Sequence, residues 1–194
     1  MKPWISESNT IKSNFLSYMV ESNRPHMDGF KKWRFHPGME FNSFEQWWGD
    51  KKKRPSAHEG VDLCCFEDSK GMIKKVDENT KIPAAFSGNI VKVFNDFLGK
   101  SIYITHDIFD PSGRRLYTAY GHTQPFDSIE INKKVKAGEI VGFVSGFPGK
   151  KTTILPHLHI TFAWIPVSIH TDDLNWNNLG NDERIKLIDP LCIL

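Results

Sequence analysis

The pattern of apolar and polar positions changes its period along the chain. Near the N-terminus, apolar residues recur every three or four positions, which places their side chains on one face of an α-helix. These positions are Ile11, Phe15, Leu16, Met19 and Val20. The polar residues and the proline between Asn23 and Pro25 would end the helix. The pattern predicts an amphipathic helix over residues 10–22.

From Ile82 onward, apolar residues fall in short runs separated by turn residues. β-Branched and aromatic residues in such runs favour strands, and Asn, Asp, Pro and Gly between them favour chain reversal. The expected strands are Gly88 to Phe94, Ser101 to His106, Leu116 to His122, Glu139 to Val144 and His157 to Trp164. The expected turns are 95–99, 110–113 and 146–149. The pattern predicts a mainly β fold of antiparallel sheet, without a nucleotide-binding βαβ unit.

Length and composition are typical of one folded domain with an extension. The chain has 194 residues, of which 39% are hydrophobic, and its 11 prolines and 14 glycines are spread along it. We expect a core domain over residues 55–194 and an N-terminal extension over residues 1–54 that packs on it. Ser43-Phe-Glu-Gln46 has capping-box spacing, which predicts a short helix near residues 43–48.

Charge and cysteine content exclude several classes of function. A formal net charge of +2 does not supply the concentrated basic face of a nucleic-acid-binding protein. The run Lys51-Lys-Lys-Arg54 is interpreted as a solvated turn or, alternatively, as a contact for an anionic wall polymer. Cys64, Cys65 and Cys192 imply no disulfide framework. The sequence predicts no membrane span and no secretory leader.

Two short fragments contain the residue types of a metal site, His58-Glu-Gly-Val-Asp62 and His157-Leu-His159. Zinc binds imidazole nitrogen and carboxylate oxygen, and a catalytic zinc usually keeps three protein ligands and one open position. On a strand, His157 and His159 would share one face, roughly 6–7 Å apart. Extended chain would hold His58 and Asp62 roughly 13 Å apart. The chain must therefore bend, and Gly60 would permit the bend.

The first fragment also has a second interpretation. It is a variant of the helical HExxH zinc motif if Glu59 is the general base and Asp62 replaces the second histidine. That arrangement needs a helix, whereas the glycine within the fragment and the cysteine pair after it are poor helix formers. The sequence favours the bent arrangement.

The order of three motifs resembles the lysostaphin-type zinc metallopeptidases, which cut peptide cross-links of bacterial cell walls. That family carries HxxxD, then Tyr-x-His, then HxH. The corresponding segments here are His58-Glu-Gly-Val-Asp62, Tyr120-Gly-His122 and His157-Leu-His159. Further similar segments begin at Ile82, Gly99 and Val135, and a similar Ile188-Asp-Pro-Leu191 follows near the C-terminus.

This resemblance implies a site and an activity. His58, Asp62 and His159 would bind one Zn2+ ion, and His122 and His157 would flank the reacting water as catalytic residues. Which of the two is the base stays open. The resemblance implies a zinc endopeptidase with peptidoglycan peptide as its substrate, held in an open, barrel-like groove of antiparallel sheet. The resemblance also implies that the protein works in the cell envelope or outside the cell. The sequence predicts no secretory leader, so its localisation stays open.

Two other functions fit parts of the sequence. A non-catalytic module of the same fold would bind zinc and act as a binding or regulatory partner, although the intact His122 and His157 argue against it. The segment from Lys133 to Gly142 is similar to a hairpin of biotinyl or lipoyl carriers, but no lysine there lies in a modification motif. We interpret His106, at the end of an expected strand, either as a residue that supports a metal-binding side chain from behind or as a packing residue, and not as a metal ligand.

Overall fold

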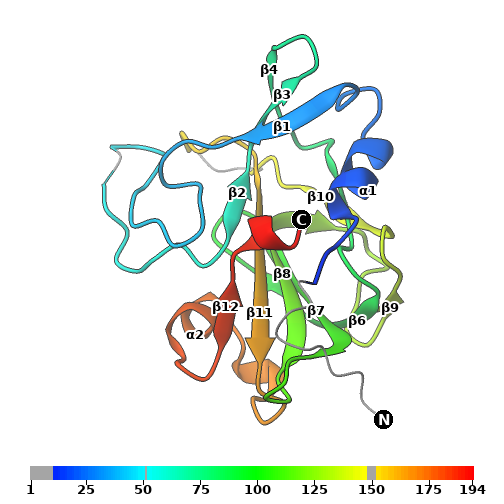
Figure 1. Ribbon diagram of the computed structural model, residues 1–194, viewed down its shortest axis with the longest axis vertical. Coiled ribbons are helices and arrows are strands. Elements are labelled where there is room, and N and C mark those ends of the chain that lie inside the picture. Colours follow the sequence, from blue (N-terminus) through cyan, green and yellow to red (C-terminus); the bar gives the residue numbers. More distant parts are fainter. Residues whose placement is uncertain (1–10, 51, 148–151) are drawn as a thin grey trace.

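One antiparallel sheet forms most of the molecule in the computed structural model, which describes residues 11–50, 52–147 and 152–194 (Figure 1). Its long strands are β6 (Gly88–Asn95), β7 (Lys100–Phe109), β8 (Arg115–Pro125) and β11 (Leu158–Ile165), adjacent in that order. β9 (Lys134–Val135) pairs with β6, and β12 (Lys186–Ile188) pairs with β11. The prediction of a mainly β, antiparallel fold is confirmed.

Shorter strands extend this sheet and form a second one. β10 (Ile140–Val144) pairs with β5 (Lys81–Pro83) and with the end of β8, and β2 (Val61–Leu63) pairs with β11. β1 (Phe30–Arg34), β3 (Cys65–Asp68) and β4 (Ile73–Lys75) form a separate three-stranded sheet. The expected turns at 95–99 and 110–113 join long strands, whereas the turn at 146–149 extends into residues outside the described ranges.

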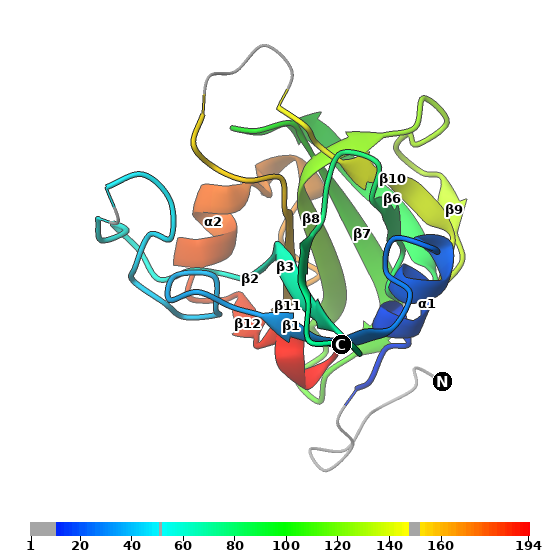
Figure 2. The ribbon, with the colours of Figure 1, turned by 90° about the horizontal axis from the view of Figure 1, so that it is seen from above.

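Two short α-helices lie on opposite sides of the large sheet (Figures 1 and 2). α1 (Phe15–Ser22) is shorter than the predicted helix, because residues 11–14 are not helical and residue 10 lies outside the described ranges. α2 (Trp176–Asn181) lies beside β12, and two 3-10 turns, η1 (Thr171–Asp173) and η2 (Pro190–Cys192), complete the helical elements. None of the helices in the described ranges has the length and apolar stretch that crossing a membrane requires.

The helix predicted near residues 43–48 does not form. Ser43 Oγ accepts a hydrogen bond from the N–H of Glu45, and Glu45 pairs with Lys53 in an isolated antiparallel bridge. Gln46 donates its N–H to the carbonyl of Lys52. The prediction was wrong because the returning chain takes the backbone groups that a helix would have paired with each other.

Both faces of the large sheet are covered by apolar side chains. One cluster includes Phe15 and Met19 of α1 together with Ile82, Tyr120 and Phe162 of the sheet, all fully buried. A second cluster packs on residues that alternate with these along the same strands, and it includes Leu174 and Leu179 near and within α2. Successive residues of a strand point to opposite faces, so this alternation fixes which side chains of β8 and β11 can reach the site.

Candidate metal centre

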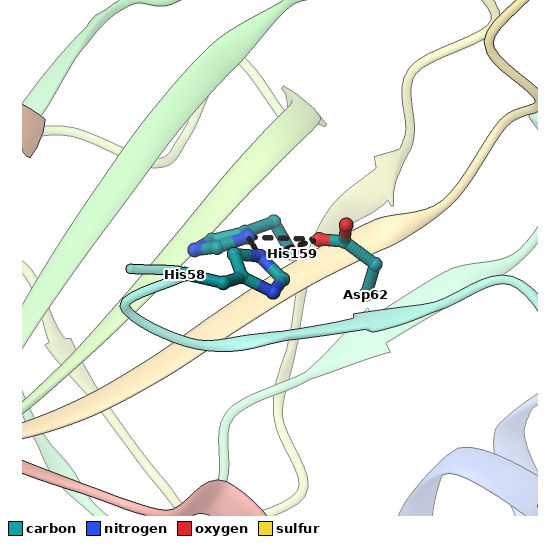
Figure 3. Close-up of side chains that lie close together, drawn as sticks. All are labelled: His58, Asp62 and His159. Atoms are coloured by element: carbon teal, nitrogen blue, oxygen red, sulfur yellow. Dashed lines mark hydrogen bonds and ion pairs between the residues drawn. The ribbon is translucent and has the colours of Figure 1, made fainter. Parts of the chain in front are cut away.

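Asp62 and His159 face each other across two neighbouring strands. The antiparallel register of β2 and β11 pairs them directly, and residues paired in this way point to the same face of a sheet. His58 lies in the loop that leads into β2, and its ring turns toward the other two side chains (Figure 3). All three side chains are buried. The two sequence fragments therefore meet in space.

Three donor atoms of these residues form a small triangle. His58 Nε2 lies 3.0 Å from His159 Nδ1 and 3.2 Å from Asp62 Oδ1, and His159 Nδ1 lies 2.9 Å from Asp62 Oδ1. Zinc bonds of about 2.0–2.1 Å in a tetrahedral arrangement separate neighbouring ligand atoms by about 3.3 Å. Two imidazole nitrogens and one carboxylate oxygen at this spacing fit a zinc ion.

Hydrogen bonds on the far side of each imidazole fix its orientation. His58 Nδ1 lies 3.0 Å from the carbonyl oxygen of Glu40, and a carbonyl can only accept, so Nδ1 carries the proton and Nε2 offers its lone pair. His159 Nε2 lies 3.0 Å from Thr161 Oγ1, which leaves His159 Nδ1 for the triangle. Such outer contacts orient metal-binding histidines and strengthen them as ligands.

The second oxygen of Asp62 is held from outside the triangle. Trp47 Nε1 donates to Asp62 Oδ2 at 2.7 Å, and Arg54 Nη2 lies 3.4 Å from the same oxygen. Burial alone would raise the pKa of Asp62, but the neighbouring His58 and His157 hold that pKa well below its usual range. Asp62 is therefore an ionised carboxylate that directs Oδ1 inward.

His157 lies next to the triangle without belonging to it. Its Nε2 is 3.8 Å from Asp62 Oδ1, and its Nδ1 lies 2.7 Å from the carbonyl oxygen of Leu155. The carbonyl can only accept, so the neutral ring carries its proton on Nδ1 and has a free lone pair on Nε2. Burial lowers the pKa of His157 to about 4, which keeps the ring neutral near pH 7. The ring of Trp47 packs edge-on against the His157 ring, with ring centroids 5.0 Å apart.

Asp96 orients His122, and the sequence reasoning missed it. Asp96 Oδ2 accepts the backbone N–H of His122 at 2.8 Å, and Asp96 Oδ1 lies 3.3 Å from His122 Nδ1. The backbone of His122 has a φ of 59°, a left-handed conformation that is uncommon outside glycine. Its ring centroid lies 4.9 Å from that of His157. The only sequence signal was an aspartate in an expected turn.

A hydrogen-bond chain links this pair to α2. Trp176 Nε1 donates to Ser101 Oγ at 2.8 Å, and Ser101 Oγ donates to Asp96 Oδ2 at 2.7 Å. The same tryptophan packs edge-on against His159, with ring centroids 4.8 Å apart. Trp176 therefore contacts one residue of the triangle and supports the residue that orients His122.

A cavity of about 260 Å³ opens onto the candidate centre. Its polar and charged lining residues are Arg54, Glu59, Asp62, Asp96, His122, His157 and His159. Its apolar walls come from Trp48, Phe97, Leu98, Ile154 and Trp176. A pocket that combines apolar walls with a few convergent polar groups is typical of a binding or active site.

Gly60 is needed for space and not for an unusual backbone conformation. A Cβ at this position would lie 2.3 Å from the carbonyl oxygen of Ile160 and 2.4 Å from Thr161 Oγ1. The chain bends between His58 and Asp62 as predicted, but glycine is required because β11 passes so close. Within residues 52–147 no helix runs through this fragment, so the helical HExxH interpretation was wrong.

Two further sequence interpretations have different outcomes. Arg54, the last residue of the basic run, lines the cavity and its side chain is only 16% exposed, so the solvated-turn interpretation does not hold for it. His106 Nε2 lies 2.8 Å from Thr118 Oγ1, and His106 Nδ1 lies 3.0 Å from the carbonyl of Ser87. His106 lies outside the triangle and packs within the sheet, as expected.

Comparison with protein families matches residues 67–171 to Peptidase family M23. The matched segment is more than half of the chain and contains His122, His157 and His159, and it begins after Asp62. No curated protein matches the chain.

Solved structures provide matches at low sequence identity. CbpA from L. salivarius REN is 13% identical over 81% of this chain and 84% of its own length, with a TM-score of 0.46. The antimicrobial peptidase lysostaphin from Staphylococcus simulans is 21% identical over 79% of this chain and 52% of its own, with a TM-score of 0.42. Csd3 of Helicobacter pylori is 22% identical over 74% of this chain and 31% of its own length, with a TM-score of 0.39. The chain spans about half the length of lysostaphin.

Proposed function

Because the chain belongs to Peptidase family M23, we propose that it is a zinc-dependent endopeptidase that hydrolyses peptide cross-links of bacterial peptidoglycan. Peptidase chemistry follows from the family, while the metal, the catalytic residues and the substrate are parts of the proposal. The observation that carries it is the triangle of His58 Nε2, Asp62 Oδ1 and His159 Nδ1, with sides of 2.9–3.2 Å.

His58, Asp62 and His159 would hold the ion, because they supply three ligand atoms and leave one side toward the cavity. A zinc ion there would polarise the scissile carbonyl and make a water acidic enough to attack it near neutral pH. Three protein ligands with a fourth position open are usual for catalytic zinc. The buried positions of the three side chains keep these ligands rigid and shielded from bulk water.

His157 would orient the attacking water. The one proton of its neutral ring is bound at Nδ1 and donated to the carbonyl of Leu155, so the lone pair on Nε2 would accept a hydrogen bond from the attacking water. Its low pKa, about 4, makes it a poor carrier of a second proton near pH 7. Holding the nucleophile in line with the carbonyl is its proposed contribution.

His122 would take the proton. The ionised Asp96 beside Nδ1 fixes the tautomer, so His122 Nε2 has a free lone pair and accepts the proton of the attacking water. The resulting positive charge is stabilised by Asp96, as in other histidine bases that have a carboxylate behind them. The same proton then passes from His122 Nε2 to the nitrogen of the departing amine.

The first experiment is mass spectrometry of muropeptides released from purified cell walls, with a chelator and with added zinc. New peptide termini that need zinc would support the activity and identify the bond. The same assay measures turnover of the variants, and elemental analysis of the purified proteins measures bound zinc. We expect His58→Ala and His159→Ala to lose both zinc and turnover, whereas His122→Ala keeps zinc and loses turnover. His170→Ala is the control, since that histidine is exposed and lies outside the cavity lining.

Two results would contradict the proposal. A His122→Ala variant with full turnover would remove the assigned role of that residue. A zinc-loaded chain that releases nothing from several wall types would instead indicate a non-catalytic module of the same fold.

A further inference from the structure

Arg54 is built into the wall of the cavity, whereas Lys52 and Lys53 of the same basic run are exposed and lie outside the cavity lining. The side chain of Arg54 is 16% exposed, whereas that of Lys52 is 74% exposed and lies 3.5 Å from an exposed carboxylate, that of Asp50. The guanidinium carbon lies 4.6 Å from the centre of a Trp48 ring. A charged side chain is rarely withdrawn from water unless it has a partner.

Three of the five N–H groups of Arg54 have partners within the chain. Nε donates to the carbonyl of Glu45 at 3.1 Å, and Nη2 donates to the carbonyl of Gly38 at 3.0 Å and approaches Asp62 Oδ2 at 3.4 Å. Among the described residues, Nη1 has no hydrogen-bond partner. The two fixed carbonyls and the stacked tryptophan hold the guanidinium plane, so the two free N–H groups have a defined direction.

The charge of Arg54 is incompletely balanced. Within the described ranges, its one carboxylate contact is the long one to Asp62, and the other oxygen of Asp62 is engaged by His58 and His159. A second anion at Nη1 would complete the pairing.

We propose that Arg54 Nη1 binds a carboxylate of the substrate peptide beside the scissile bond, which makes Arg54 a specificity-determining residue. This inference rests on the proposed peptidase function and specifies its substrate as a peptide with a free carboxylate close to the cleaved bond. Apolar cavity walls such as Trp48 and Ile154 strengthen a charge-assisted hydrogen bond, because they keep water away from it.

The other charges of the cavity determine where a carboxylate is accepted. Glu59 and Asp96 also line it, and each would repel an anion placed beside it. Arg54 therefore offers the favourable protein contact for a carboxylate, and this contact fixes the direction in which the peptide enters. Two sources supply the same chemistry, the α-carboxylate at a peptide end and the side-chain carboxylate of a diamino acid.

The test uses two pairs of synthetic branched peptides with the zinc-loaded full chain. One pair ends in D-alanine as the free acid or the amide, and the other contains diaminopimelate with its side-chain carboxylate free or amidated. We expect kcat/KM for the acid to exceed that for the amide by about tenfold or more in one pair, and that pair identifies the source. Arg54→Met abolishes the preference, because KM rises more for the acid than for the amide and the two peptides are then cut with similar kcat/KM.

Matched variants separate anion binding from support of Asp62. Lys52→Met removes a nearby exposed charge and keeps the preference, and Arg54→Lys retains part of it because the charge remains without the planar fork. If Arg54→Met loses zinc or fails to fold, Arg54→Lys replaces it as the test. A reduced preference for the acid in Arg54→Lys upholds the inference, and an unchanged preference overturns it. Equal losses for acid and amide, or no preference in the unsubstituted chain, would overturn the inference.

Failure of the proposed function has a different signature. If the unsubstituted chain cuts none of the four peptides, the peptidase proposal fails for these substrates, and equilibrium binding of the same peptides to the zinc-loaded chain tests Arg54 directly. Tighter binding of an acid than of its amide that depends on Arg54 upholds the inference. Equal binding of acid and amide overturns it.

Discussion

Asp96 determines the position of His122 through both backbone and ring. The two oxygens of Asp96 accept hydrogen bonds from the N–H groups of Leu98 and Gly99, from Ser101 Oγ and from the N–H of His122. A strained left-handed residue persists only where its surroundings hold it, and His122 has that conformation. The proposed base is therefore placed by a carboxylate distant from it in the sequence.

Replacing Asp96 by Asn separates positioning from metal binding. The amide keeps an oxygen for Leu98 and Gly99 but presents N–H groups where His122 and Ser101 donate, so the ring loses its orientation. We expect unchanged zinc content, a kcat lower by on the order of 100-fold and little change in KM. Asp110→Asn is the control, because Asp110 also binds loop backbone but in a turn away from the cavity. Equal losses in both variants would contradict this role.

A second prediction at this scale concerns pH and stability. Burial lowers the pKa of His106 to about 4, so between that value and the unfolded value of about 6.5 the unfolded chain binds more protons than the folded one. The contribution of His106 to the free energy of unfolding is therefore fully present above about pH 6.5 and decreases as the pH falls toward 4. Linkage gives a loss of about 2 kcal/mol by pH 5 from this residue.

Urea unfolding of chelator-treated protein measures this loss as the difference between the free energies of unfolding at pH 7.5 and pH 5. His157 has a similarly low pKa and adds to the decrease in the unsubstituted chain. His106→Gln, which cannot take a proton, therefore loses about 2 kcal/mol less than the unsubstituted chain between the two pH values. An identical decrease in both proteins would mean that His106 does not titrate between folded and unfolded states.

The residues that the sequence identified and those it missed differ in a physical way. His58 and Asp62, like His157 and His159, form short motifs whose spacing carries information. Asp96, Trp47 and Arg54 lie in loops and act through contacts with residues that are distant in the sequence. No local pattern marks an aspartate or a tryptophan as the partner of a distant side chain. Their roles depend on how the loops return to the sheet.

At the scale of elements, the segment between β1 and β2 contributes one side of the candidate centre. It forms the loop at the left of Figure 1, beside β2. Trp47 of this loop binds Asp62 and packs on His157, while Met39 lies with Cys64 and Cys65 in a small buried cluster against Trp47. This loop is therefore a structural part of the site.

Trp47→Phe removes one N–H donor and keeps an aromatic ring against His157. Asp62 Oδ2 then loses its shortest contact, and such outer-contact losses typically weaken metal binding by 10–100-fold. We expect zinc affinity to fall by about tenfold with little change in the free energy of unfolding. Competition with a chromogenic chelator measures the affinity. Trp48→Phe is the control, because Trp48 packs on Trp47 and Arg54 without contacting Asp62, and equal affinities of the two variants would contradict the assignment.

The strands of the sheet were predictable to different degrees. The long strands β6, β7, β8 and β11 contain enough alternating and β-branched residues to be seen locally. The short strands β2, β3 and β5 do not, because three or four residues carry too little pattern, and their pairing is decided by partners far along the chain. The pairing of Asp62 with His159 across β2 and β11 was therefore not predictable from either segment alone.

At the scale of the whole molecule, the N-terminal part is tied to the sheet and to the C-terminus. Asn23 exchanges hydrogen bonds with the backbone of Lys81 in β5, and the N–H of Ser13 donates to the carbonyl of Ile193. Phe15 and Met19 belong to the main buried cluster. The division into an extension over residues 1–54 and a domain over 55–194 stays a prediction, and these contacts indicate how to test it.

Phe15→Ala removes a fully buried ring from that cluster, and such truncations cost about 3–5 kcal/mol. Because the cluster joins α1 to strands that lead to the candidate centre, we expect urea unfolding followed by tryptophan fluorescence and by zinc release to give one coincident transition, shifted to lower urea. Phe44→Ala is the matched control, since that ring is 53% exposed in the same N-terminal part. If fluorescence and zinc release separate into two transitions, or if Phe15→Ala is as stable as Phe44→Ala, the N-terminal part folds independently of the sheet.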